Sequence, residues 1–186
     1  MKKLICVVVM MVTMGCSMAN PSSPTPVIGG AGRIESSEPI GVLVPGTASL
    51  WLAGAADGVK ANGFAPGEGV DVAPAQSPVF VTLKVGQVYT YLVGFGCVKN
   101  DPELACNDAN GGDPVSHYAG VENGVLNLTA PLNSLIGLFE GENQPFLLGK
   151  SGELTARSGK LYLGTMDGWG WFNNSGGFAV KFYDGK

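Results

Sequence analysis

The chain has 186 residues, of which 11 are basic and 15 are acidic, and its formal net charge is −4. Only 14% of the residues are charged, so no basic stripe offers nucleic acid an electrostatic footprint, and we expect no nucleic-acid partner. The 29 glycines and 12 prolines favour a fold of short strands and turns over one of long helices.

The N-terminal segment is typical of an export signal. Residues 1–3 carry positive charge, and residues 4–14 are apolar but too few to span a bilayer. Two processing sites fit: an ordinary signal peptide of residues 1–19, or a lipoprotein signal of residues 1–15 that leaves a lipid on Cys16. Either one predicts an exported protein that is secreted, periplasmic or anchored at the cell envelope by that lipid.

Residues 20–39 are predicted to be a linker, because prolines stand there among serine, threonine and glycine, a composition that extends rather than packs. The folded domain is then expected at residues 40–186. That length is sufficient for one hydrophobic core and too short for two.

Within the domain, short apolar or alternating segments predict strands throughout. Residues 84–86 are expected to join two of them, 77–83 and 87–93, as a hairpin. No segment shows a capped amphipathic helix, so the pattern indicates an all-β sandwich or jelly roll. The predicted strands are residues 40–44, 48–53, 77–83, 87–93, 126–129, 135–139, 145–148, 153–156, 160–164 and 178–182.

Two cysteines, Cys97 and Cys106, bracket a short loop. In an exported protein this arrangement predicts a disulfide, which would add about 2–3 kcal/mol by the chain-entropy model. A metal or redox pair is disfavoured, because the chain has a single histidine and no C-x-x-C motif.

A polar string at residues 107–117 follows the cysteines. Asp108, Asn110 and Asp113 could give oxygens to a calcium ion, and Asp113 and His117 are candidates for bonding a sugar. The alternative is that the string is a solvated loop and that His117 is a surface or structural residue.

Catalytic machinery is hard to assemble from this sequence. It contains no Gly-x-Ser-x-Gly, no phosphate-binding loop and no zinc triad. A glycosidase pair drawn from Asp113, Glu122, Glu140 and Glu142 is the alternative. We do not expect an enzyme.

The C-terminal segment reads as strand, polar loop, strand. Residues 161–163 lead into the loop, and residues 178–182 alternate after it. The connection is about twice as long as a tight hairpin allows. Asp167, Asn173 and Asn174 supply the side-chain oxygens that Ca²⁺ prefers, although Asp, Asn and Gly are also ordinary turn residues.

The order of residues in 167–180, DGWGWFNNSGGFAV, resembles the C-terminal signature of the galactophilic bacterial lectins of the PA-IL type. The runs at residues 44–81 and 130–137 are similar to the opening and central strands of related exported sandwich domains. The resemblance implies a galactose-binding-domain-like β-sandwich, or jelly roll, of two antiparallel sheets with one calcium ion. It implies side-chain ligands from Asp167, Asn173 and Asn174, and carbonyl ligands from Gly170 and Phe95.

In that family the calcium contacts two sugar hydroxyls, so the resemblance implies calcium-dependent binding of a galactose-type carbohydrate or glycoconjugate. Trp169 or Trp171 could place a ring face against the sugar, or both could be packing residues. The alternative function is an exported structural or surface-attachment domain that binds calcium but no sugar.

Overall fold

The computed structural model describes residues 38–55, 76–101, 103–112, 124–168 and 171–185. The described residues belong to one compact unit. The predicted signal peptide with Cys16, and the predicted linker up to residue 37, lie outside the described residues and stay predictions. No helix in the described part of the chain is long and apolar enough to cross a membrane.

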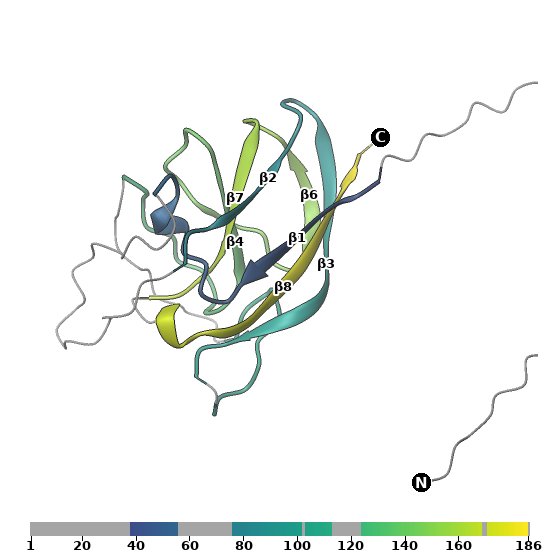
Figure 1. Cartoon of the computed structure of the whole chain (residues 1–186). Helices are drawn as coiled ribbons and strands as arrows, with labels where there is room; N and C mark the ends of the chain where they lie inside the picture. The colour runs from purple at the N-terminus through teal and green to yellow at the C-terminus, as the bar shows by residue number, and fades with distance from the viewer. Residues whose placement is uncertain (1–37, 56–75, 102, 113–123, 169–170, 186) are drawn as a thin grey trace, which may run out of the picture. The chain divides into compact units, whose positions relative to one another are not determined.

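In the described residues, eight strands form two four-stranded sheets, and every pair of neighbouring strands is antiparallel (Figure 1). This confirms the all-β fold with two antiparallel sheets. The first sheet has the order β1 (Ile40–Pro45), β8 (Ser175–Asp184), β3 (Val88–Lys99), β6 (Ser151–Thr155). The second has the order β2 (Val79–Thr82), β7 (Lys160–Thr165), β4 (Leu135–Phe139), β5 (Phe146–Leu147).

The main core contains residues of both sheets. Strand β8 alternates as expected, so Phe178, Val180 and Phe182 are buried while the residues between them are more exposed. Leu161 and Leu163 of β7 belong to the same buried cluster. A hydrogen bond also links the two sheets. The buried Tyr91 hydroxyl of β3 donates to the carbonyl of Leu148, just after β5, at 2.6 Å.

A second core covers the other face of the second sheet. Ile136 and Leu138 of β4 pack there with Trp51 and Trp171, whose ring centroids lie 5.9 Å apart. Because β4 is covered on both faces, all five of its residues are buried and its sequence does not alternate.

The predicted strand at residues 48–53 was wrong. The segment contains a 3₁₀ helix, η1 (Leu50–Leu52), in which all three side chains are buried in the second core. The alternation of Leu50 and Leu52 around Trp51 suggested a strand with two different faces. The short helix instead buries all three residues, because the sheet and the surrounding segments enclose it.

The predicted hairpin at residues 77–93 was also wrong. β2 pairs with β7 in one sheet, and β3 pairs with β6 and β8 in the other, so residues 84–86 turn between sheets. Residues 126–129 form no strand. Leu126 is exposed, and Leu128 only partly packs against the second core.

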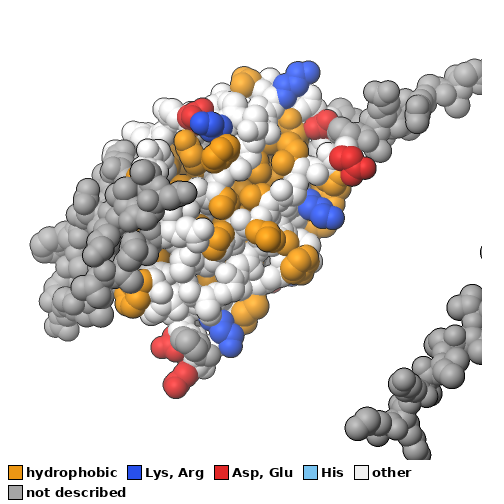
Figure 2. All heavy atoms as spheres, in the orientation of Figure 1, with side chains coloured by type: hydrophobic (Ala, Val, Ile, Leu, Met, Phe, Trp, Pro, Cys, Tyr) orange, Lys and Arg blue, Asp and Glu red, His pale blue; other side chains and the backbone are white. Residues whose placement is uncertain are grey.

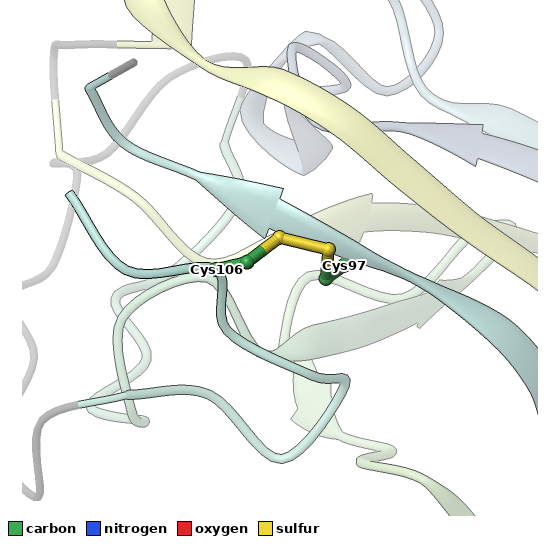
Figure 3. The surroundings of a disulfide bond; sticks show 2 residues. All are labelled: Cys97 and Cys106. Carbon is green, nitrogen blue, oxygen red and sulfur yellow. A yellow bond between two sulfur atoms is a disulfide. The ribbon is translucent and has the colours of Figure 1, made fainter. Parts of the chain in front are cut away.

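The predicted disulfide is confirmed. Cys97, near the end of β3, is joined to Cys106 on the segment that returns beside the strand (Figure 3). Val98 and Asn107, the next residue of each segment, exchange two backbone hydrogen bonds of 2.9 Å. The cross-link and this bridge fix the base of the loop between the cysteines.

The outward face of the first sheet carries several apolar side chains, which Figure 2 shows on the face where β1 and β8 lie in Figure 1. Leu43 is 69% exposed and Phe95 is 75% exposed. These two residues occupy one row across the sheet, because each pairs with Ala179 of β8.

Replacing a buried and an exposed aromatic residue tests the second core. Trp171→Ala should lower the free energy of unfolding by about 3–5 kcal/mol, because it removes a large side chain that is 1% exposed. Phe95→Ala, the matched control, should change it by about 0.5 kcal/mol or less. Denaturant unfolding followed by circular dichroism measures both, and equal losses would contradict the described packing.

Candidate functional site

Residues 166–174 connect β7 of the second sheet to β8 of the first. The segment therefore crosses from one sheet to the other, and this explains why it is longer than a hairpin loop. At the same end of the sandwich β1 and β3 end and β4 begins, as their antiparallel pairing with β8 and β7 requires.

The carbonyl of Gly46, directly after β1, joins three of these strand ends. It accepts a hydrogen bond of 2.7 Å from the Thr165 hydroxyl and one of 2.9 Å from the Asn174 side-chain amide. The Gly46 amide in turn donates to the carbonyl of Gly176 at 2.9 Å. Gly46 thus holds the end of β7 and the start of β8 in fixed positions.

Asn174 is only 7% exposed, and its two amide atoms differ in their surroundings. Nδ2 is fixed by the bond to Gly46, so Oδ1 must point away from that carbonyl. Oδ1 is buried and has no hydrogen-bond partner among the described residues. A buried acceptor without a donor costs free energy, and in native structures it commonly indicates a bound water or ion.

Asp167 lies two residues beyond Thr165 and is 4% exposed. One of its carboxylate oxygens, Oδ1, accepts the N–H of Gly168 at 2.6 Å. Because Thr165 and Asn174 share the Gly46 carbonyl, Asp167 and Asn174 belong to the same corner of the sandwich. A nearly buried carboxylate is costly unless a positive group or several donors offset its charge.

Further buried polar side chains belong to this end of the sandwich. Asn133 is fully buried and has a φ of 63°. Its backbone N–H donates to the carbonyl of Met166 at 2.6 Å. Both amide atoms of its side chain lack hydrogen-bond partners among the described residues. Buried side-chain oxygens without a partner in the described part of the chain also occur on Ser49, Asn100 and Ser134. Among the described residues, several such atoms gather at this end of the sandwich.

The sequence left two roles open for Trp171, a ring face for a sugar or a packing residue. The structure shows Trp171 as a packing residue. It is 1% exposed and begins the 3₁₀ turn η2 (Trp171–Asn173) with its side chain in the second core. Its carbonyl accepts the N–H of Asn174 at 3.2 Å. Trp171 is therefore an anchor that sets the position of Asn174.

Two other predicted ligands lie differently from Asn174. Asn173 is its neighbour in the chain but is exposed, so its side chain lies at the rim of the corner. Phe95 pairs with Ala179, five residues beyond Asn174 along β8, which corresponds to about 16 Å of extended strand. The residue of β3 that reaches the start of β8 is Lys99, which pairs with Ser175. Phe95 was misplaced because β3 continues past a bulge and is longer than its sequence pattern suggested.

Four predicted residues lie outside the described residues: Gly170, Trp169, Asp113 and His117. Of the polar string that contains the last two, Asp108 and Asn110 serve the fold. Asp108 accepts the N–H of Asn110 at 2.9 Å and pairs with Lys150 at 3.1 Å, and the backbone hydrogen bond and then Lys150 lower the pKa of Asp108. The side-chain oxygen of Asn110 accepts the N–H of Lys150.

The described part of the chain gathers no group of three or more His, Cys, Asp and Glu residues that could hold a metal ion. The corner instead offers one carboxylate and neutral oxygens, a donor set that suits Ca²⁺ better than zinc or copper. Asp167 and Asn174 fit a hard cation, because both are buried and Asn174 has an unused oxygen.

Sequence reasoning missed Gly46 and Thr165, which orient the site without being candidate ligands. Gly46 stands in an ordinary Pro-Gly turn, and Thr165 is one of many threonines in strands. Nothing local in the sequence shows that they meet, because 119 residues separate them.

Comparisons with known proteins give one similarity of note. No protein-family model and no curated protein matches the chain. The chain is similar to a solved structure described as "EclA N-terminal domain; PllA-like lectin", with 26% sequence identity and a TM-score of 0.40 over 56% of this chain and 82% of that chain.

Adjacent asparagines allow a direct test of the corner. In the presence of a chelator, Asn174→Ala should lower the free energy of unfolding by about 1–2 kcal/mol, because Gly46 loses a buried donor. Asn173→Ala should change it by about 0.5 kcal/mol or less, because that side chain is exposed. Chemical denaturation of both variants checks this; equal losses would contradict the different burial of the two side chains.

Proposed function

We propose that the corner formed by Asp167 and Asn174 binds calcium and, together with it, a carbohydrate. The observation that carries the proposal is the buried Oδ1 of Asn174, which is oriented by the bond from Nδ2 to Gly46 and has no donor among the described residues. The resemblance of residues 167–180 to the galactophilic lectin signature supports the same assignment.

Each residue of the proposed site has a distinct role. Asp167 supplies negative charge, Asn174 supplies a fixed amide oxygen, and Asn173 is a candidate ligand from the exposed rim. Gly46, Thr165 and Trp171 hold these residues in place. Calcium bound here would accept two neighbouring sugar hydroxyls as ligands in place of water.

Preorganisation is what suits this corner to binding. Asn174 is fixed by its side-chain bond to Gly46 and by its backbone bond to Trp171, so little side-chain freedom remains to be lost when a ligand arrives. The φ of 82° at Gly176 and its close contact with the Cys97 carbonyl exclude a side chain there. The glycine of the Asn-Asn-Ser-Gly signature therefore serves the approach of β8 to β3.

We propose galactosides as the first sugars to test, by the resemblance alone, and export to the cell envelope or beyond as the setting. The competing function is a structural or surface-attachment domain that binds calcium without sugar. The two differ in one property, which is whether the bound ion has coordination positions that a sugar can occupy.

Charge removal at Asp167 tests the site. Asp167→Asn keeps the size of the side chain but removes its charge, so calcium affinity should fall at least tenfold, or about 1.4 kcal/mol. Asp184→Asn is the matched control, because it removes an exposed charge at the far end of β8 and should leave calcium affinity unchanged. Isothermal titration calorimetry measures both.

The same samples test the sugar. Methyl galactoside should bind calcium-loaded wild-type protein and Asp184→Asn, and chelator should abolish that binding. Calcium binding without any sugar binding on a broad glycan array would support the structural alternative. Absence of calcium binding at millimolar concentration would contradict the site itself and leave a buried water as the partner of Asn174.

A further inference from the structure

A pocket of about 390 Å³ lies at the same end of the sandwich. One wall comes from the loop that the disulfide closes, a second from the segment after it, and a third from the turn that precedes β4. The described residues that line it are Asn100, Leu104, Ala105, Asn107, Gly112 and Leu132.

The walls of the pocket are held together by covalent and hydrogen bonds. The Cys97–Cys106 disulfide and the Val98–Asn107 bridge close the first wall (Figure 3). The N–H of Gly112 donates to the carbonyl of Leu132 at 2.9 Å and joins the other two walls. A Cβ on Gly112 would lie 2.6 Å from the Asn107 amide, so the glycine leaves room for that side chain.

The chain links the pocket to the candidate calcium corner on two sides. Asn100 follows Lys99, which pairs with Ser175, the residue after Asn174. On the other side, Leu132 precedes Asn133, which bonds to the residue before Asp167. A ligand held at the corner can therefore extend into the pocket.

The chemistry of the lining favours a particular kind of ligand. It combines two side-chain carboxamides with two leucines and an alanine, and its described residues carry no charge. The two carboxamides are those of Asn100 and Asn107. Carboxamides both donate and accept hydrogen bonds, so they complement the N–H and C=O of an acetamido group, and the leucines suit its methyl group.

We propose that this pocket is a subsite for an acetamido-bearing sugar, an N-acetylhexosamine joined to the sugar at the calcium corner. The inference rests on the proposed function, because it needs the first sugar at that corner. It adds a second recognised sugar unit and predicts that a disaccharide, not a single sugar, is the preferred ligand.

A pair of disaccharides isolates the acetamido group. Lactose and N-acetyllactosamine differ only by the hydroxyl or acetamido substituent on the reducing sugar. With calcium present, wild-type protein should bind N-acetyllactosamine about tenfold more tightly than lactose by calorimetry. Methyl galactoside, which does not extend into the pocket, is the reference ligand.

Variants of two exposed leucines supply the control. Leu104 is 55% exposed in the pocket wall, and Leu147 is 47% exposed on β5. Leu104→Ala should reduce the preference for N-acetyllactosamine to threefold or less, and Leu147→Ala should keep it. Ala105→Trp should abolish the preference by filling the pocket. Binding of methyl galactoside verifies that each variant is folded.

The outcomes separate this inference from the proposed function. Binding of methyl galactoside with equal affinities for the two disaccharides would overturn the subsite and leave the proposed function standing. A preference that persists in Ala105→Trp would do the same. If no sugar binds to the calcium-loaded protein, the proposed function and the subsite fail together.

Discussion

The carbonyl oxygen of Gly46 accepts hydrogen bonds from both Thr165 and Asn174. These residues come from the end of β7 and the start of β8, which belong to different sheets. The two bonds therefore connect both layers of the sandwich at the end where its polar residues are buried. They also decide the chemistry of Asn174, since occupying its amide nitrogen leaves its oxygen for another partner.

The packing of Trp171 supports this arrangement from the other side. Its indole lies beside Trp51 in the second core, and its backbone carbonyl holds the N–H of Asn174. Burial of a large aromatic side chain contributes several times more than one hydrogen bond, so the position of the polar corner depends on an apolar contact. The resulting rigidity limits the entropy lost when a ligand binds.

The sequence predicted the fold class well, because alternation in 178–182 and the apolar run at 135–139 are strong strand signals. Pairing was harder to predict. The turn at residues 84–86 looks like a hairpin, yet it joins two sheets. Only long-range contacts determine which strand each of the two flanking segments pairs with. The run around Trp51 failed for a related reason, because a second core on the outer face of a sheet leaves no periodic signal in a short segment.

The site was predictable in part. Asp167 and Asn174 stood out by residue type, and both are buried in the structure. Asn173 and Trp171 were also candidates from the same loop. Asn173 is exposed and Trp171 is buried in the second core, because the 3₁₀ turn that contains both residues directs their side chains differently. Phe95 was misplaced because the length of β3 and its bulge depend on pairing with β8.

Terbium, which replaces calcium at oxygen sites, gives the most direct test of the central claim that this corner holds a cation. Excitation of tryptophan should sensitise terbium luminescence, because Trp171 lies three residues from Asn174 in the chain and contacts it through a backbone hydrogen bond. The account predicts a saturable signal that calcium displaces and that Asp167→Asn and Asn174→Ala both weaken. A signal that is absent from the wild type, or unchanged in both variants, would contradict it.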